Sequence, residues 1–272
     1  MTLVRRLKSL ARYALESVTG PACLLIGQRS LLKLLLRREM VARTSGTLLG
    51  GAWMVVQPTL QVLGLWFFLD VVLKVRSPGQ VPFVDYFLVG MICWMMINEV
   101  LQRNLTVLVE FGPLFQRTIF PLALLPLLPI LVSGAIYGTV FAVVAAVLGG
   151  AAAGLKALIT AAVILLWLMP FSYLFAVLGL FVREARQVVP FALTLLMYLT
   201  PILYMPELLP ESFRAWMAIN PLADVMALIH GAVQDGSWTP GNALRPFLLW
   251  AILLPLCWML FRRTEPHMRE AL

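Results

Sequence analysis

Residues 118–155 contain no charged side chain, and this stretch restricts the fold more than any other feature of the sequence. A helix needs about 20 apolar residues to cross the hydrocarbon core of a bilayer. Backbone N–H and C=O groups without hydrogen-bond partners have a high free-energy cost in that core, so segments of this kind cross it as α-helices. The rest of the chain agrees, because 12% of its 272 residues are charged, whereas a soluble domain carries about a quarter. We therefore predict an all-α, polytopic membrane protein.

Prolines and glycines divide the apolar sequence into six predicted transmembrane helices. Three prolines crowd the start of the charge-free stretch and Gly149-Gly150 ends its apolar run, so we expect a single span there. The six predicted spans are residues 44–69, 86–106, 122–148, 157–182, 188–204 and 246–261. Residues 205–240, between the last two spans, are too apolar for an ordinary loop, yet four prolines interrupt them. We expect a re-entrant outer segment there.

The distribution of Lys and Arg predicts the orientation. With the N-terminus inside, sixteen of the 21 Lys and Arg fall on the cytoplasmic side and five on the outer side. Both termini are therefore expected in the cytoplasm. The chain then divides into a cytoplasmic leader, residues 1–47, and a six-span domain, residues 48–272, that ends in a cytoplasmic tail from residue 262.

The leader carries a pattern typical of a helix lying in the membrane interface. Arg29, Lys33 and Arg37 recur at every fourth position, while Leu31, Leu32, Leu34 and Leu35 project from the other side. The alternative is a solvated basic helix that packs on a soluble partner. Because nearly half of the basic residues lie in this leader, the net charge of +8 indicates contact with anionic lipid rather than nucleic acid.

The sequence carries no nucleotide or metal-binding motif. The nearest approach to a phosphate-binding loop, at residues 149–156, places Leu155 where the phosphate-binding lysine must stand. The 13 acidic residues are scattered, and His230 and His267 have no partner at a suggestive spacing. We expect no ATPase activity, no metal site and no cofactor in this chain. A membrane enzyme acting on lipid-linked sugar phosphates remains an alternative, because active sites assemble in space.

Three stretches, in this order, resemble permease subunits of polysaccharide ABC exporters, of the O-antigen type. They are RRE at 37–39 with Arg43, SGTLLG at 45–50, Trp53 and Pro58; LFQRTIFP at 114–121; and VREARQVV at 182–189 with TPILY at 200–204 and NPL at 220–222. Thr44, Gln116 and Leu122 depart from the usual residues of that family. The resemblance runs from about residue 37 to residue 238.

The resemblance implies a transport subunit that forms a homodimer above two ATPase subunits, which bind the ATP and Mg²⁺. Its cargo would be a lipid-linked, O-antigen-like polysaccharide crossing the bacterial inner membrane. The ATPase would dock on a coupling segment: Phe111, Leu114, Phe115, Gln116, Arg117 and Thr118. Alternatives with the same fold are export of capsule, teichoic acid, drug or lipid. A purely structural membrane subunit is a third possibility.

Charged and aromatic residues near the predicted inner ends of the spans are the further candidate site residues. Arg37, Arg38 and Arg43 could meet the pyrophosphate of a lipid-linked donor, since guanidinium groups match phosphate oxygens, and Trp53 is a gate candidate. Glu99 and Arg103, one turn apart, could pair near an inner gate. The candidate canal residues are Trp94, Tyr137 and Tyr198.

Overall fold

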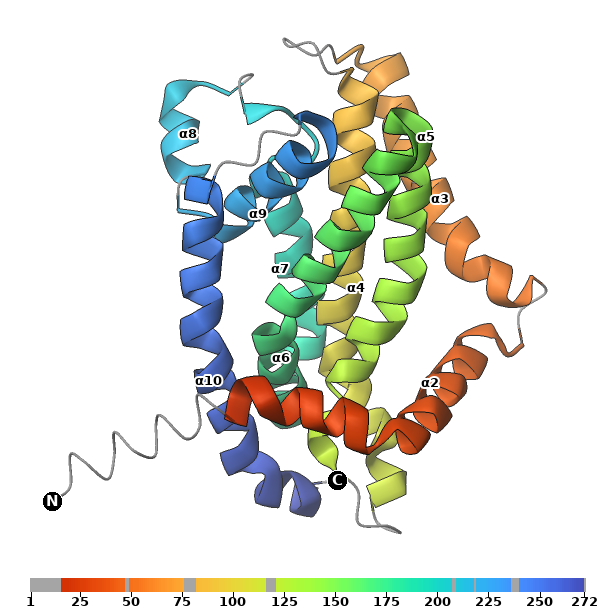
Figure 1. Cartoon of the computed structure of the whole chain (residues 1–272), viewed down its shortest axis with the longest axis vertical. Coiled ribbons are helices and arrows are strands. Elements are labelled where there is room, and N and C mark those ends of the chain that lie inside the picture. Colours follow the sequence, from red (N-terminus) through yellow and green to blue (C-terminus); the bar gives the residue numbers. More distant parts are fainter. Residues whose placement is uncertain are drawn as a thin grey trace, which may run out of the picture.

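The computed structural model describes residues 16–46, 49–75, 82–115, 121–206, 209–217, 219–235 and 240–271, and these form helices joined by short turns (Figure 1). Residues 16–27 are helical. The longer helices that follow are α2 (Arg29–Thr44), α3 (Trp53–Trp66), α4 (Phe83–Phe115), α5 (Leu127–Trp167), α6 (Met169–Phe181), α7 (Ala185–Leu199), α8 (Glu211–Met217), α9 (Pro221–His230) and α10 (Pro240–Ala271). Short 3₁₀ or π segments are η1 (Gly50–Ala52), η2 (Phe67–Val72), η3 (Leu122–Leu124) and η5 (Gly231–Asp235).

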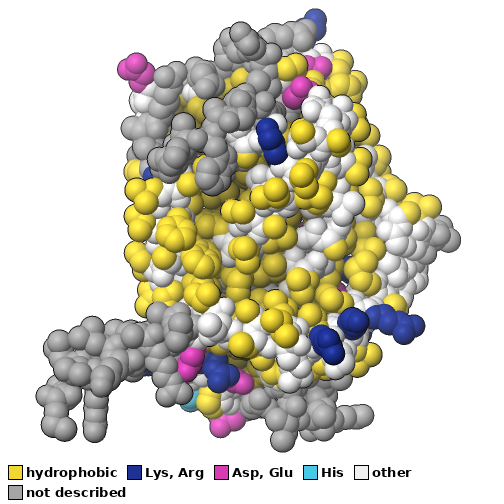
Figure 2. All heavy atoms as spheres, viewed as in Figure 1, with side chains coloured by type: hydrophobic (Ala, Val, Ile, Leu, Met, Phe, Trp, Pro, Cys, Tyr) yellow, Lys and Arg dark blue, Asp and Glu magenta, His cyan; other side chains and the backbone are white. Residues whose placement is uncertain are grey.

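Four of the described helical stretches are long and apolar enough to cross a membrane. They are Gly50–Val72, Phe83–Gly112, Leu122–Trp167 and Ala243–Met268, and shorter apolar helices accompany them. On the face shown in Figure 2, apolar side chains form a band between two zones in which charged side chains gather. An apolar band between polar ends is the arrangement that a bilayer requires of a bundle of spanning helices.

Helix α4 is the centre of the bundle. It packs against α3, α5, α6, α7 and α9, and most of its apolar length is buried, whereas few residues of α3 are buried. Asn104, on α4, is fully buried, and its side-chain amide donates to the carbonyl of Val100 at 2.8 Å. This bond offsets part of the cost of burying the amide, whose Oδ1 has no hydrogen-bond partner among the described residues.

Helix α5 is a hairpin whose two arms meet at Gly150. This residue has φ 81° and ψ 176°, a left-handed backbone conformation that favours glycine. The arms run antiparallel, because a Cβ on Gly154 would meet Ala146 at 2.9 Å and one on Gly138 would meet Ala161 at 3.7 Å. Small residues let two helices approach this closely in a membrane. The predicted break at Gly149-Gly150 is confirmed.

A tight turn links α6 to α7. The guanidinium of Arg186 donates two hydrogen bonds, of 2.9 and 2.7 Å, to the carbonyl of Gly179 near the end of α6. This bond satisfies a carbonyl at the helix C-terminus, where the helix itself supplies no donor. Gly179 has no side chain because the backbone of Leu105, on α4, occupies the space where a Cβ would stand.

The region predicted as re-entrant contains α8 and α9, at the end of the bundle opposite α2 (Figure 1). The Asn220 side chain caps α9 by accepting a hydrogen bond from the backbone N–H of Leu222 at 3.0 Å. It also donates to the Thr200 hydroxyl at 2.9 Å, which ties this region to the end of α7. The depth of these helices in a membrane stays a prediction.

The leader helices lie across the end of the bundle to which the last turns of α10 also extend (Figure 1). Arg29, Lys33 and Arg37 are exposed and Leu35 is buried, as the amphipathic pattern predicted. Leu34 departs from that pattern, since it is 64% exposed although it was assigned to the apolar side. The remainder of the predicted leader, residues 1–15 and 47, lies outside the described residues.

Substitution of Gly179 by alanine is expected to separate α6 from α4. The new methyl group would collide with backbone atoms of Leu105, which cannot rotate away. Overpacking of this kind costs about 1–3 kcal/mol or more. Gly64→Ala is the matched control, because a Cβ at Gly64 meets nothing within 4 Å. Thermal unfolding in detergent should show a lowered Tm for the first variant alone, and equal Tm values would contradict the packing described.

Candidate functional site

A polar recess between α3, α4 and α5 is the candidate functional site. Its volume is about 400 Å³. Its lining residues are Arg43, Trp53, Met54, Gln57, Pro58, Gln61, Met91, Trp94, Met95, Asn98, Glu99, Gln102, Ile136 and Tyr137. Ionisable and amide side chains within membrane-crossing helices are costly, and such groups usually serve a function.

Four amide side chains project into the recess from two helices. Gln57 and Gln61 are one turn apart on α3, and Asn98 and Gln102 are one turn apart on α4. The Gln102 amide donates to the Asn98 carbonyl oxygen at 2.9 Å. Each amide offers both donors and acceptors, so the row can bind hydroxyl groups without carrying charge.

A network of charged side chains closes one end of the recess and joins the leader to α4. Glu39 accepts from Arg43 at 3.1 Å and from Arg103 at 2.9 Å. Arg43 also pairs with Glu99 at 2.8 Å, and Arg103 pairs with Glu110 at 2.7 Å. The structure therefore does not show the expected pair of Glu99 with Arg103, because each of them binds a different partner. Arg43, which belongs to the leader, is the arginine that pairs with Glu99.

The Arg43–Glu99 pair lies between two recesses. Arg43, Glu99 and Gln102 line the recess just described and also a second one of about 510 Å³. The second recess continues past Arg103 and Thr106, toward the C-terminal end of α4. The Arg43–Glu99 ion pair thus contributes to the walls of both polar spaces.

Glu39 is the electrostatic centre of the network. It is only 4% exposed, and burial by itself raises its pKa. The hydrogen bonds and positive charges of Arg103 and Arg43 outweigh that effect, so the pKa of Glu39 lies below its ordinary value. The carboxylate is therefore ionised at neutral pH and holds both arginines in place.

The predicted site residues divide into two groups in the structure. Trp53, Trp94 and Tyr137 come together in the recess with Arg43. Tyr198 lies apart from them on α7 and is 55% exposed. Arg37 is exposed on α2, away from the recess lining.

The predicted coupling segment begins in the core. Phe111 is buried, and the guanidinium of Arg38 lies 5.0 Å above its ring. Phe111 is thus covered by the leader and is not open to a partner in this structure. Helix α4 continues through Leu114 and ends at Phe115. Gln116, Arg117 and Thr118 lie outside the described residues.

Residues 30–231 of the chain match the ABC-2 type transporter family. The chain belongs to that family. It is therefore a membrane permease component of a transporter, as the sequence predicted, and permeases of this family pair with ATPase subunits. No three His, Cys, Asp or Glu side chains within the described parts of this ABC-2 permease lie where they could hold a metal ion.

Curated relatives of this ABC-2 permease belong to polysaccharide export systems. It is 24% identical to an O-antigen export system permease protein of Klebsiella pneumoniae over 213 residues, which cover 76% of this chain and 81% of the relative. A protein of the same description from Myxococcus xanthus is 27% identical over 205 residues, with coverages of 73% and 78%. The polysialic acid transport protein of Escherichia coli is 24% identical over 250 residues, with coverages of 89% and 96%.

Sequence reasoning missed the amide row and Glu39. Gln57, Gln61, Asn98 and Gln102 carry a detectable signal, since two amides at a four-residue spacing on an apolar helix share one face. Glu39 had no such signal. It was expected only as part of the basic motif of the leader, and its burial depends on α2 docking against α4.

Replacement of Glu39 by glutamine is expected to loosen α2 from α4. The substitution removes the carboxylate that Arg43 and Arg103 share. A hydrogen bond to a charged group contributes about 1.5–3 kcal/mol to the free energy of unfolding. Folding lowers the pKa of Glu39. The carboxylate therefore contributes fully to the free energy of unfolding above its pKa in the unfolded chain, about 4.3, and this contribution is lost as the pH falls through its pKa in the folded protein. The decrease in Tm of the variant relative to wild type should be largest at neutral pH and smaller in acid.

Glu265→Gln is the control for this experiment. Glu265 forms a local pair with Arg262 on α10, and exposed pairs of this kind contribute about 0–1 kcal/mol. A Glu39→Gln variant that unfolds like Glu265→Gln at neutral pH would show that the network does not hold α2.

Proposed function

We propose that this permease is the membrane subunit of a bacterial ABC exporter that moves a lipid-linked, O-antigen-like polysaccharide across the inner membrane. The observation that carries the proposal is the row of uncharged amide side chains beside aromatic rings, on two helices long and apolar enough to cross a membrane. A sliding sugar chain needs many weak hydrogen-bonding partners and flat apolar surfaces, with few strong charges to trap it. Gln57, Gln61, Asn98, Trp94 and Tyr137 supply that combination. The printed functions of the relatives agree with this chemistry.

The lipid pyrophosphate of the donor would be recognised at Arg43. One of its terminal nitrogens, Nη2, is buried and has no hydrogen-bond partner. A guanidinium forms several directed hydrogen bonds to phosphate oxygens. A phosphate could accept a hydrogen bond from Nη2 and compete with Glu99 for Nη1. Opening of the Arg43–Glu99 pair would then join the two recesses. Arg37, exposed on the same helix, would attract the anion from the interface.

The proposed topology has six crossings. They are α3 with η2, α4, the first arm of α5, the second arm of α5 with α6, α7, and α10. The positive-inside distribution then favours α2 and the end of α10 on the cytoplasmic side. The segment with α8 and α9 would lie on the outer side, and both termini would be cytoplasmic.

A homodimer would complete the site. Helix α3 forms one wall of the recess, yet it is the least covered of the apolar helices. A second copy laid against α3 would turn two open recesses into one closed canal. Each copy would bind one ATPase subunit, which holds the ATP and Mg²⁺, at the segment that follows Phe111.

Capsular polymer is the second candidate cargo. The polysialic acid transport protein matches the longest part of this chain among the relatives described. The same recess would serve either polymer, because its amides and rings recognise general features of sugars.

Removal of single amides is expected to slow polymer export. Gln61→Leu and Asn98→Leu each remove hydrogen bonds to the moving chain, which should lower the export rate about three- to tenfold. Thr59→Val is the control, since the Thr59 hydroxyl bonds the Val55 carbonyl and does not line the recess. Export would be followed as surface polymer in cells that depend on the variant. Unchanged export in both amide variants would contradict a sugar path through the recess.

Changes in the coupling segment are expected to separate the permease from its ATPase. Phe115→Ala and Arg117→Glu should lower ATPase co-purification and ATP turnover in lipid nanodiscs at least about tenfold, the effect of losing a central interface residue. Arg263→Glu, the same charge change at an exposed position of α10, should have little effect. Polymer-linked activity without any bound ATPase would instead favour a membrane enzyme.

A further inference from the structure

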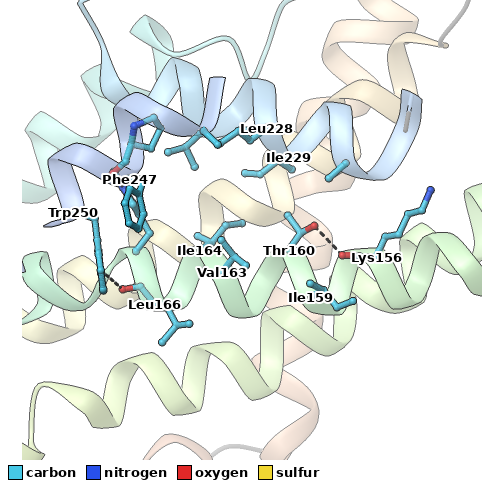
Figure 3. Close-up of a pocket in the computed structure, with 15 residues that line it drawn as sticks. Lys156, Ile159, Thr160, Val163, Ile164, Leu166, Leu228, Ile229, Phe247 and Trp250 are labelled. Carbon is cyan, nitrogen blue, oxygen red and sulfur yellow. Dashed lines mark hydrogen bonds between the residues drawn. The ribbon is translucent and has the colours of Figure 1, made fainter. Parts of the chain in front are cut away.

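An apolar groove on the flank of the bundle lies outside the candidate site. It has a volume of about 570 Å³ and is lined by the second arm of α5, by α9 with η5, and by the first turns of α10 (Figure 3). Its size falls in the range of about 300–1,000 Å³ that is usual for pockets binding small ligands. None of its lining residues belongs to the polar recess.

Two tryptophans close the end of the groove that lies deeper in the bundle. The Trp167 indole donates to the carbonyl of Pro246 at 3.1 Å, and the Trp250 indole donates to the carbonyl of Leu166 at 2.9 Å. These reciprocal bonds tie α5 to α10 and satisfy both indole N–H groups. The groove therefore ends in a fixed wall that offers only apolar ring surface to an occupant.

The opposite end of the groove carries one basic side chain. Lys156 stands at that end, away from Trp250 and Phe247 (Figure 3). It is exposed, and within the described parts of the chain no carboxylate pairs with it. Arg245, which precedes Pro246 on α10 near the tryptophan end, is engaged by Asp224 at 3.4 Å. Thr160 is also satisfied, because its hydroxyl donates to the Lys156 carbonyl at 2.8 Å.

The length of the groove matches one leaflet of a bilayer. From Lys156 to Trp167 the helix rises about 16 Å, at 1.5 Å per residue, and the hydrocarbon core is about 30 Å thick. Lys156 lies six residues after the hairpin turn at Gly150, at the end of the bundle opposite α2. A lysine at this level extends its ammonium group toward the headgroups while its stem stays on apolar surface.

We propose that this groove binds one acyl chain of an anionic bilayer phospholipid, with the lipid phosphate paired to Lys156. The apolar walls accept the chain, the tryptophan pair limits how deep it reaches, and the ammonium group of Lys156 selects an anionic headgroup. The lipid would fill the space between the α5 hairpin, α9 and α10. This site is independent of the exported polymer and of the recess that we assign to it.

Native mass spectrometry of the delipidated full chain, titrated with phosphatidylglycerol or with phosphatidylcholine of the same acyl chains, tests the site. Wild type should retain one phosphatidylglycerol in preference to phosphatidylcholine. Lys156→Gln should lower that preference about fivefold, the usual effect of one basic residue near an anionic lipid surface. Lys74→Gln, at another exposed lysine, should leave the preference unchanged.

A variant that fills the groove tests the acyl-chain half of the proposal. Ala243→Phe, on the groove wall, should abolish retention of either lipid, whereas Ala251→Phe, on an exposed position of the same helix outside the groove, should not. Retention unchanged in both Lys156→Gln and Ala243→Phe would overturn the proposal. Preferential retention of a polyprenyl phosphate would overturn it in favour of the cargo carrier. Dissociation of a dimer by Ala243→Phe would show that the groove is an interface between copies.

Discussion

The buried carboxylate of Glu39 joins the leader to the membrane helices, and the arrangement of the candidate site depends on it. Glu39 belongs to α2, yet it binds Arg103 of α4 as well as Arg43 of its own helix. Arg43 is thereby held where it reaches Glu99, so the leader supplies the basic wall of the recess. Removing one ion from a buried network leaves another charge without a partner. The leader, α4 and the recess are for this reason constrained together.

Some polar side chains in the bundle serve packing between helices, and others face the recess. Asn104 is buried and bonded within its own helix, and the indoles of Trp167 and Trp250 bond across helices, so these groups serve packing. The amides of Gln57 and Gln61 instead face an open recess. Lipid offers no compensation to a polar side chain, so side chains of this kind need either a protein partner or a polar space. For the amides of α3, the recess provides this polar space.

The sequence predicted the features that depend on neighbouring residues in the chain. Gly149-Gly150 indicated the α5 hairpin, and the spacing of Arg29, Lys33 and Arg37 indicated the exposed face of α2. Features that depend on packing between distant segments were not accessible. Glu99 and Arg103 were expected to pair because they are one turn apart. In the structure two residues of the leader pair with them instead, Arg43 with Glu99 and Glu39 with Arg103. Phe111 was expected at a docking surface, but Arg38 covers it.

Helix α4 connects every part of the proposed mechanism. Its middle contributes Trp94, Asn98 and Glu99 to the recess, its C-terminal part carries Arg103 and Glu110, and its end leads into the predicted coupling segment. A buried helix packed on five neighbouring helices moves as a rigid body rather than bending, because a close-packed core does not deform continuously. A push from an ATPase at Phe115 would therefore displace the wall of the recess that α4 forms, and the Glu39–Arg103 ion pair would transmit the motion to α2.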